Sequence, residues 1–396
     1  MSRRNRMPPP GARIAVAMSG GVDSSVAAYV LSKAGYDLVG VTAWTLNGPG
    51  KCCNDALVNA GRVCEQLGMP YDTVDLRAEF SHYVMDYYNN SYEAGLTPNP
   101  CVECNRFVKW EPLVRYAREE LGADYLATGH YAILEAANEG NAVNLFRSVD
   151  EHKDQTYMMA RVYPHDLENT VFPLGEMTKP EVVALARAVD LPTAYSKESQ
   201  DICFVLDGQA NYMNQVFGQK MGAIVDFDTG RTLGEHEGYY RYTLGQRKGV
   251  GVAAGRPVYV VKIDPASNTV YLGDAHHLES VSFTVRQPNW LTPPPGSPST
   301  VLATAPFEAM VKIRYNTPPT LGWVEPSGEG DEATLTVTLR QPVSAITPGQ
   351  IAAFYDTDFR QLYGGGYIEK HLTHRSMSAG DWQEKRDNLP NLYCEV

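Results

Sequence analysis

Several features that define common classes of protein are missing from this chain of 396 residues. It contains no run of about 18 apolar residues, so a membrane-spanning helix is not expected. The basic residues after Met1 are not followed by an apolar core, so we expect no export signal either. The seven cysteines are odd in number and scattered, which argues against a disulfide framework. This usage favours a reducing cytoplasm and reactive or metal-binding thiols.

Two common nucleotide-binding motifs are also absent. No Gly-Lys-Ser or Gly-Lys-Thr follows the glycines near residue 20, so the sequence has no Walker A loop and no loop lysine for a β/γ-phosphate pair. No G-x-G-x-x-G turn is present there, which argues against a dinucleotide site. The net charge of −12 argues against a general nucleic-acid binder.

What the chain does have is a short apolar run that ends in Ser-Gly-Gly-Val-Asp-Ser-Ser at Ser19–Ser25. The run Ile14–Ala17 is typical of a buried parallel strand, and apolar residues continue at helical spacing after the turn. Because Gly20 and Gly21 lack a Cβ atom, the backbone N–H groups can approach anionic oxygens closely. The start of the following helix also favours negative charge. The pattern therefore predicts a phosphate-binding loop.

Strand-like and helix-like segments alternate through the first half, which predicts an α/β domain with a Rossmann-like parallel sheet. Its ligand should lie at the carboxyl ends of the strands, where Ser19–Ser24 and Ala127–His130 both fall. The other expected strands are Leu38–Trp44, Tyr71–Leu76 and Tyr125–Gly129, and the expected helices are Ala56–Leu67, Glu79–Tyr92 and Phe107–Leu121.

The second half has a different pattern. Short segments rich in Gly and Tyr follow Asp207 and predict a small α+β central domain. After a proline-rich break at Pro288–Pro298, short alternating runs such as Ile351–Tyr355 predict a C-terminal β-barrel. We expect a catalytic domain over residues 1–206, a central domain over 207–280, a barrel over 281–374 and a mobile tail over 375–396.

Three cysteines stand in polar segments. Cys101 and Cys104 form a C-x-x-C pair in a proline-stiffened loop before a predicted helix, whose start would lower a thiol pKa. Cys203 lies in a Ser-Gln-Asp-Ile-Cys-Phe turn. A zinc site, a thioredoxin-like redox pair and persulfide transfer are all possible, but the fourth zinc ligand and the strand before a redox pair are missing. We interpret the remaining cysteines as ordinary buried or tail residues: Cys52, Cys53, Cys64 and Cys394.

The segment Tyr239–Arg256 carries four cations and no acidic residue. Its tyrosines, Tyr239, Tyr240 and Tyr242, alternate with glycines and basic residues. Such a segment can follow an RNA backbone and stack on bases. A solvated surface loop is the alternative interpretation.

Taken together, the phosphate loop, the Asn-Pro-Cys-x-x-Cys-Asn segment and the Ser-Gln-Asp-Ile-Cys-Phe turn resemble the tRNA-specific 2-thiouridylases of the PP-loop ATP pyrophosphatase superfamily, which has the adenine nucleotide alpha hydrolase-like fold. The resemblance covers roughly residues 13–369 and includes Tyr-Thr-Leu-Gly-Gln-Arg-Lys-Gly in the basic segment. It implies a cytoplasmic tRNA-uridine 2-sulfurtransferase that thiolates the wobble uridine, position 34, with ATP and Mg²⁺.

The resemblance also implies roles for individual residues. Cys203 would carry the persulfide and Cys104 would act as the nucleophile, and the resulting Cys104–Cys203 disulfide would need a reductant. A cysteine desulfurase or a sulfur-relay protein would supply the sulfur. The implied ATP-binding residues are Ala17, Met18, Ser19, Gly20, Gly21, Val22, Asp23, Ser24, Ala43 and Gly129. The expected tRNA contacts are Asn99, Pro100, Cys101, His130, Lys153, Asp154, Gln155, Arg314, Tyr315 and Gln350, with Arg247 and Lys248 added from the basic segment.

One position departs from a common form of the family. Cys101 stands where many members have Asp, which could act as a general acid or base. The alternative to persulfide transfer is therefore a [4Fe–4S] cluster held by Cys101, Cys104 and Cys203, with the fourth iron open to sulfide. Two other classes stay open: a PP-loop ligase of a small molecule, and a non-catalytic tRNA-binding or sulfur-relay protein.

Overall fold

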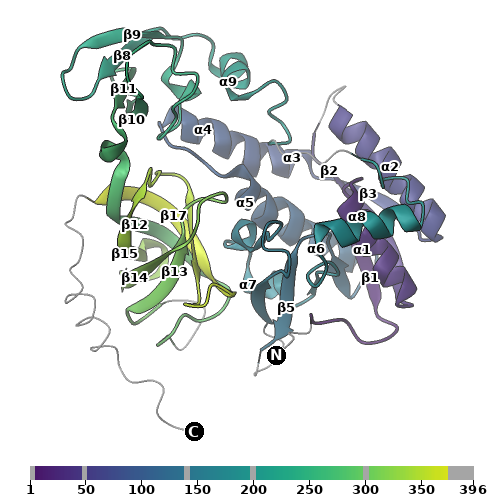
Figure 1. Ribbon diagram of the computed structural model, residues 1–396. Helices are drawn as coiled ribbons and strands as arrows, with labels where there is room; N and C mark the ends of the chain where they lie inside the picture. Colours follow the sequence, from purple (N-terminus) through teal and green to yellow (C-terminus); the bar gives the residue numbers. More distant parts are fainter. Residues whose placement is uncertain (1–4, 47–50, 138–142, 197–201, 298–302, 373–396) are drawn as a thin grey trace.

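The structure is a computed structural model that describes residues 5–46, 51–137, 143–196, 202–297 and 303–372 (Figure 1). The expected tail over 375–396 and Cys394 lie outside these ranges, as do the side chains of Cys52 and Cys53. Within the described ranges, no helix combines the length and the apolar character that crossing a membrane requires.

The first part of the chain forms the predicted α/β domain. Its five-stranded parallel sheet has the order β3-β2-β1-β4-β7. Strand β1 lies at the centre, so Val16 pairs with Gly40 on one side and with Ala127 on the other. The strands are β1 (Arg13–Ala17), β2 (Asp37–Trp44), β3 (Tyr71–Asp75), β4 (Tyr125–Ala127) and β7 (Thr170–Val171).

Helices cover both faces of this sheet, as the near-continuous apolar strands require. Ile14 and Val16 of β1 pack in one cluster with residues of α1, α2 and α8, whereas Ala15 packs in a second cluster on the other face. The first group of helices is α1 (Val22–Lys33), α2 (Lys51–Leu67) and α8 (Lys179–Ala188). The second group is α3 (Arg77–Phe80), the π-helix η1 (Ser81–Asp86), α4 (Tyr87–Glu93), α5 (Pro100–Cys104), the π-helix η2 (Asn105–Trp110) and α6 (Glu111–Glu119).

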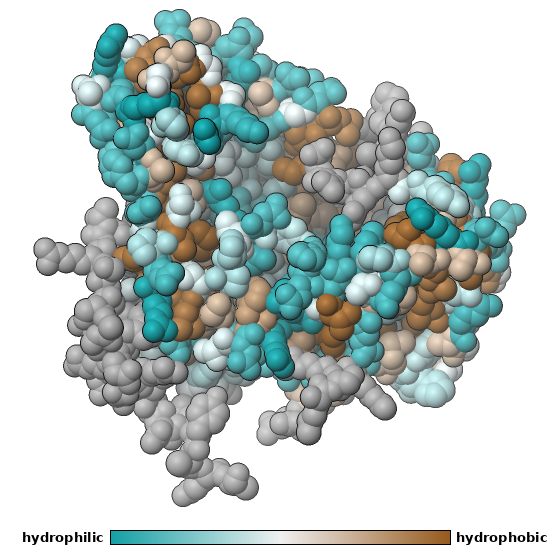
Figure 2. All heavy atoms as spheres, in the orientation of Figure 1, coloured by the Kyte–Doolittle hydropathy of each residue, from teal (hydrophilic) through white to brown (hydrophobic). Residues whose placement is uncertain are grey.

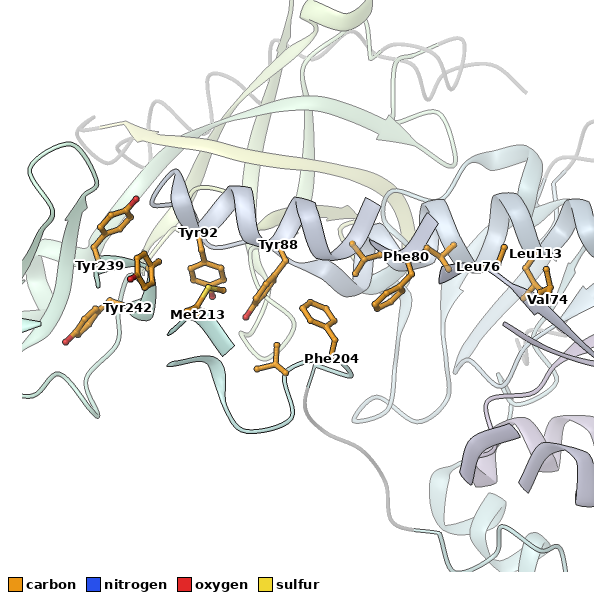
Figure 3. Packing of buried hydrophobic residues seen from close by; sticks show 14 of the residues in the cluster. Val74, Leu76, Phe80, Tyr88, Tyr92, Leu113, Phe204, Met213, Tyr239 and Tyr242 are labelled. Carbon is orange, nitrogen blue, oxygen red and sulfur yellow. The ribbon is translucent and has the colours of Figure 1, made fainter. Parts of the chain in front are cut away.

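A row of buried side chains joins the first domain to the central one (Figure 3). The row starts at Val74 in the edge strand β3, follows the α3–η1–α4 segment through Phe80 and Tyr88, and reaches Met213 and Tyr242 of the central domain. The two domains therefore share one hydrophobic cluster.

The central domain holds helix α9 and a four-stranded sheet of order β10-β11-β8-β9. Its elements are α9 (Gln209–Phe217), β8 (Gly222–Asp226), β9 (Thr232–His236), η4 (Tyr239–Arg241), β10 (Tyr259–Asp264) and β11 (Thr269–Gly273). It agrees with the predicted small α+β unit.

The last part is the predicted β-barrel. Six strands in the order β12-β15-β14-β13-β16-β17 form a ring, which pairing between β12 and β17 closes. The strands are β12 (Glu279–Trp290), β13 (Phe307–Lys312), β14 (Thr320–Ser327), β15 (Thr334–Ser344), β16 (Ile351–Tyr355) and β17 (Gln361–Leu372). The short remaining helices are η3 (Thr156–Met159), α7 (Pro164–Leu167), η5 (Ala275–Leu278) and η6 (Gly330–Glu332).

The expected break at Pro288 is wrong, because β12 continues through it to Trp290. The pairing with β17 shifts register between Arg286 and Asn289, and Gln287 has a φ of 49°. This irregularity is a bulge, where a proline without an N–H group does not interrupt the ladder.

The sequence also does not predict a hairpin of the first domain that extends the barrel sheet. Strands β5 (Ala132–Ala136) and β6 (Val143–Arg147) pair with each other, and β6 pairs with β17 through Phe146–Gln361 and Leu145–Leu362. The barrel is therefore attached to the first domain by a shared sheet.

Candidate active site

The predicted phosphate loop lies between β1 and α1, at the carboxyl end of the central strand. Gly20 has a φ of +71°, and a Cβ atom there would lie 2.5 Å from the Cα atom of Ala56. Gly21 precedes the helix in an extended conformation. The backbone N–H of Ser19 donates to Oγ of Ser24 at 3.2 Å, across the loop. The loop therefore has the small side chains and the close backbone that a phosphate site needs.

The segment after β4 meets this loop, which confirms that the two sequence patches share one edge of the sheet. A Cβ atom on Gly129 would lie 2.7 Å from the backbone nitrogen of Ser24. On the other side, Thr42 donates from Oγ1 to the carbonyl of Met18 at 2.7 Å, which places the following Ala43 beside the loop. Gly129 and Ala43 thus flank the loop from the two strands that neighbour β1.

Asp23 of the loop has two donors that its local sequence does not reveal. The Nζ atom of Lys179 lies 2.8 Å from Oδ1 and 2.7 Å from Oδ2 of Asp23. The hydroxyl of Tyr131 donates to Oδ1 at 2.7 Å. Lys179 is the first residue of α8, which Thr178 and Glu181 start with a capping box. The loop itself lacks a lysine, but folding brings one to it from a distant helix.

The C-x-x-C pair lies inside a helix and not in the loop that the sequence predicts before Phe107. Asn99 caps α5, accepting from the N–H of Val102 at 3.4 Å, and Pro100 occupies the first helical position. Cys101 is exposed and Cys104 is half-buried. The helix then continues into the π-helix η2.

Cys203 lies next to this pair. Its neighbour Phe204 packs against Tyr88 at 5.2 Å and Phe80 at 5.8 Å between ring centroids, which anchors the segment on the α3–η1–α4 helix (Figure 3). The Cys203 side chain is exposed, yet the surrounding protein desolvates its sulfur and raises its pKa, to which Cys104 and Cys101 add a smaller electrostatic effect. The structure therefore brings together the three thiols that the sequence singles out.

The thiol pKa values are shifted opposite to the prediction. Surrounding protein desolvates the sulfur atoms and raises the pKa of Cys104 to about 11 and that of Cys203 to about 12. It also raises the pKa of Cys101. The predicted lowering by a helix start is wrong because the loss of solvent outweighs the field of a five-residue helix. Cys64, which packs in the cluster on the other face of the sheet, is buried as expected.

Lys109 is a site residue that the sequence analysis missed. Its charge lowers the pKa of each of the three thiols, against the effect of burial. It also lowers the pKa of His130, which burial already holds well below its usual value. Lys109 follows Cys104 by five residues, the hydrogen-bonding interval of a π-helix. Only a Cys-Asn-x-x-x-Lys spacing read on a π-helix would have indicated it.

A series of neighbouring residues runs from the phosphate loop towards the thiols. Gly129 touches the backbone of Ser24, and His130 follows it directly. The ring of His130 lies 5.2 Å from that of Trp110 in η2 and within the field of Lys109. Lys109 in turn acts on the thiols.

The barrel holds the segment before Cys101. Gln350 donates from Nε2 to the carbonyl of Pro98 at 3.2 Å, and the carbonyl of Pro348 accepts from the N–H of Thr97 at 2.9 Å. Asn99 and Pro100 are buried beside these contacts. The predicted contact Gln350 therefore lies next to the predicted base-contact segment.

A second set of contacts, centred on Arg161, connects α5 to the barrel. The carboxylate of Glu103 lies 3.4 Å from Nε of Arg161, and both side chains are at most 5% exposed. Arg161 also donates to the carbonyl of Gln287 at 2.8 Å and lies over the ring of Tyr367, both in the barrel. The helix that carries two thiols is thus tied to the barrel by a buried ion pair.

In the Lys153–Gln155 segment, Lys153 and Gln155 are half-buried and Asp154 is buried. Lys153 lines an open cleft of about 960 Å³. The carboxylate of Asp154 is buried, accepting from the N–H of Ser148 at 3.1 Å and the hydroxyl of Thr156 at 2.7 Å. Gln155 accepts from the N–H of Tyr131 at 2.9 Å. Asp154 and Gln155 therefore shape the turn that presents Lys153.

Arg314 and Tyr315 lie where the barrel faces the other two domains. Arg314 donates to the carbonyl of Leu244 at 3.1 Å and to Oγ1 of Thr347, and burial lowers its pKa. The ring of Tyr315 lies 6.2 Å from that of Tyr157. Both side chains are half-buried, so solvent reaches part of each.

The basic segment is less accessible than its sequence suggests. The rings of Tyr239, Tyr240 and Tyr242 are buried, so the expectation that they stack on bases is wrong. Arg241 pairs with Glu237, and Arg256 pairs with Asp226 and Asp274, all outside the segment. Arg247 and Lys248 are exposed, and their role in RNA binding stays a proposal.

On the face shown in Figure 2, apolar side chains form separate patches among hydrophilic ones.

Comparisons with known proteins agree with this arrangement. Residues 12–207 match the family described as tRNA methyl transferase HUP domain, residues 210–274 the tRNA methyl transferase PRC-barrel domain, and residues 280–368 the aminomethyltransferase beta-barrel domain. A tRNA-specific 2-thiouridylase MnmA of a Synechococcus species is 43% identical over 90% of this chain and 97% of its own. The enzyme of the same name from Thermosynechococcus vestitus is 42% identical over 90% of this chain and 94% of its own.

A solved structure also matches in part. The U34-tRNA thiolase NcsA from Methanococcus maripaludis with its [4Fe-4S] cluster is 22% identical, covering 49% of this chain and 61% of its own at a TM-score of 0.33. A similarity of that size supports no argument about function.

Proposed function

The chain belongs to the tRNA-specific 2-thiouridylase family, and we propose that it thiolates the wobble uridine, position 34, by adenylating O2 and transferring sulfur from a persulfide on Cys203. Membership makes it a tRNA-uridine 2-sulfurtransferase. The position of the uridine and the order of steps are the parts that we propose. The reaction needs free thiols, so we expect it in the reducing cytoplasm.

In the first step, O2 of the uridine attacks the α-phosphorus of ATP. The bond to the bridging oxygen breaks, and its electron pair leaves with pyrophosphate into the loop of Ser19–Ser24. The loop offers backbone N–H groups and the start of α1 to this anion. The carboxylate of Asp23 and the hydroxyl of Ser24 are oxygen ligands of the kind that Mg²⁺ uses together with phosphates, and the ion would offset phosphate charge there.

In the second step, the terminal sulfur of the Cys203 persulfide attacks C2, and AMP leaves with the former O2. The thiolate of Cys104 then attacks the Cys203 sulfur. The S–S bond breaks, its electron pair stays on the sulfur bound to C2, and 2-thiouridine and a Cys104–Cys203 disulfide result. A thiol reductant supplies two electrons to restore the pair, and a cysteine desulfurase or sulfur-relay protein supplies the next sulfur.

The observation that carries this proposal is the series of neighbours from the loop towards the thiols: Gly129 lies against the loop, His130 follows it, and the charge of Lys109 acts on both His130 and Cys104. A small-molecule ligase would need the loop but not the three thiols. A non-catalytic sulfur relay would need the thiols but not the loop.

Mass spectrometry of tRNA nucleosides tests the proposal. The protein is incubated with unmodified tRNA, ATP, Mg²⁺ and a persulfide donor, and we expect 2-thiouridine at position 34 together with AMP. The Asp23→Ala variant is expected to form none. ATP consumption that tRNA does not stimulate would contradict the proposal.

The cluster alternative has a separate test. Among the described residues, no three His, Cys, Asp or Glu side chains are placed to hold a metal ion, so the three thiols would have to rearrange to ligate irons. We expect anaerobically purified protein to thiolate tRNA with no stoichiometric iron or acid-labile sulfide. Finding both at four per chain, lost in Cys101→Ala, would replace the persulfide mechanism.

A further inference from the structure

We propose that Lys179 is the cation that the phosphate loop lacks in its own sequence: its ammonium group pairs with Asp23 in the ATP-free protein and binds the β- and γ-phosphates of ATP, and then the departing pyrophosphate. The proposal concerns a residue outside the ATP-binding set implied by the family resemblance. It rests on the proposed function in one respect, namely that the loop binds ATP.

The position of Lys179 is fixed from both ends. Its side chain is 15% exposed, and Nζ contacts both carboxylate oxygens of Asp23 at 2.7 and 2.8 Å. Its backbone N–H donates to Oδ2 of Asp150 at 2.8 Å, and the Thr178–Glu181 capping box defines where α8 begins. The ammonium group therefore reaches the loop from a rigid helix that packs against α1.

The ion pair is also open to a ligand. The side chain of Asp23 is 29% exposed and that of Lys179 is 15% exposed, so solvent reaches both partners. An anion that enters the loop can therefore approach the ammonium group without moving α8.

The charge on the loop explains why such a cation is needed. Neutral N–H and O–H donors line the loop, and Asp23 adds a negative charge beside the site of a polyphosphate. A lysine in contact with Asp23 offsets that charge in the empty loop. When phosphate oxygens arrive, the same ammonium group can donate to them and so stabilise the leaving pyrophosphate.

Binding of inorganic pyrophosphate, ATP and AMP, measured by calorimetry on the full-length protein, tests the proposal. We expect Lys179→Met to weaken pyrophosphate and ATP binding by about tenfold or more, the size of one lost charged hydrogen bond. AMP binding should change less than about twofold, because AMP lacks the β- and γ-phosphates. Lys179→Arg, which keeps the charge, should recover part of the loss.

Arg187→Met is the matched control, because Arg187 lies on the same helix and lines the same cleft, and its guanidinium lies 5.3 Å from the ring of Tyr195. It should bind pyrophosphate like the wild type. Unchanged pyrophosphate affinity in a folded Lys179→Met variant would overturn the proposal, and so would an equal loss for AMP, which indicates a structural role. If the wild-type protein binds neither pyrophosphate nor ATP, the proposed function itself fails.

Discussion

At the scale of single residues, the thiol chemistry is governed by a balance between burial and one ammonium group. Desolvation by the surrounding protein raises the pKa of Cys104 to about 11 and that of Cys203 to about 12, and Lys109 opposes both shifts. Since a thiol reacts as thiolate, both groups are mostly protonated and slow to react at neutral pH in the free protein. Lys109 therefore increases the fraction of thiolate that remains available.

Lys109→Met should make the three thiols less reactive. Removing the ammonium group raises the thiol pKa values further, and the alkylation rate with iodoacetamide at pH 7.5 should fall about three- to tenfold. In the wild type, the rate at Cys104 should keep rising up to about pH 11, because its pKa is raised to about 11. Lys109→Arg keeps the charge and serves as the control; an equally large loss in that variant would mean that charge is not the cause.

Cys203→Ala should separate the two chemical steps. Adenylation of O2 needs no sulfur, so tRNA-dependent formation of the adenylated intermediate should persist while 2-thiouridine disappears. Pyrophosphate release in a single turnover measures the first step, and nucleoside mass spectrometry measures the second. The division of roles is wrong if the folded variant loses both steps.

At the scale of elements, helix α5 is held more firmly than a surface loop would be. Its cap at Asn99, its first-turn proline and the buried Glu103–Arg161 pair all fix its position. Burial raises the pKa of Tyr367, and the nearby Glu103 raises it further. Arg161 contacts both α5 and the barrel. The stability of their packing therefore depends on this one side chain.

Arg161→Met should expose this dependence. It leaves the carboxylate of Glu103 buried without its cation, which costs about 3 to 5 kcal/mol of unfolding free energy. Urea unfolding followed by tryptophan fluorescence measures the loss. The double variant Glu103→Met with Arg161→Met should recover part of it, because no buried charge remains.

Arg286→Met is the matched control for that experiment, because Arg286 also stacks on Tyr367, at 4.6 Å, but has no contact with Glu103 in the described structure. It should change the unfolding free energy by less than about 1 kcal/mol. A loss equal to that of Arg161→Met would assign the effect to ring stacking alone.

The same scale shows what the sequence could and could not predict. The strand–loop–helix unit around Ser19–Ser24 follows from local patterns, because its glycines and its apolar periodicity are local. The π-helices η1 and η2 do not follow from local patterns. On an α-helix, residues five apart, such as Cys104 and Lys109, do not share a face, so this spacing gives no signal in the sequence. The bulge at Gln287 and the ion pair between Lys179 and Asp23 arise only from tertiary packing.

At the scale of the whole molecule, the net charge of −12 repels RNA, so binding must depend on individual basic side chains at the interface. Two of the four cations in the basic segment are neutralised by carboxylates, and Arg247 and Lys248 are exposed. The proposed tRNA contacts therefore come from all three domains, with Gln350 and Arg314 in the barrel and His130 in the first.

Replacing Arg247 and Lys248 by glutamine should weaken tRNA binding and flatten its salt dependence. Each cation that contacts a phosphate releases condensed counterions, so the slope of log affinity against log salt should fall by about 1 for each of the two. Filter binding between low and moderate salt measures the slope. Arg231→Gln, an exposed arginine elsewhere in the central domain, should leave it unchanged; an unaltered slope in the double variant would remove these residues from the RNA interface.

The hairpin β5–β6 affects how this protein folds during its synthesis. Its outer strand finds its partner only at Gln361 and Leu362 of β17. At ribosomal rates of ~5 to 20 residues per second, the nascent first domain waits roughly 10 to 40 seconds with that strand edge bare. A fragment that ends after the first domain would lack β17, so the outer edge of β6 would stay unpaired. Such a fragment would be prone to associate with other copies through that edge.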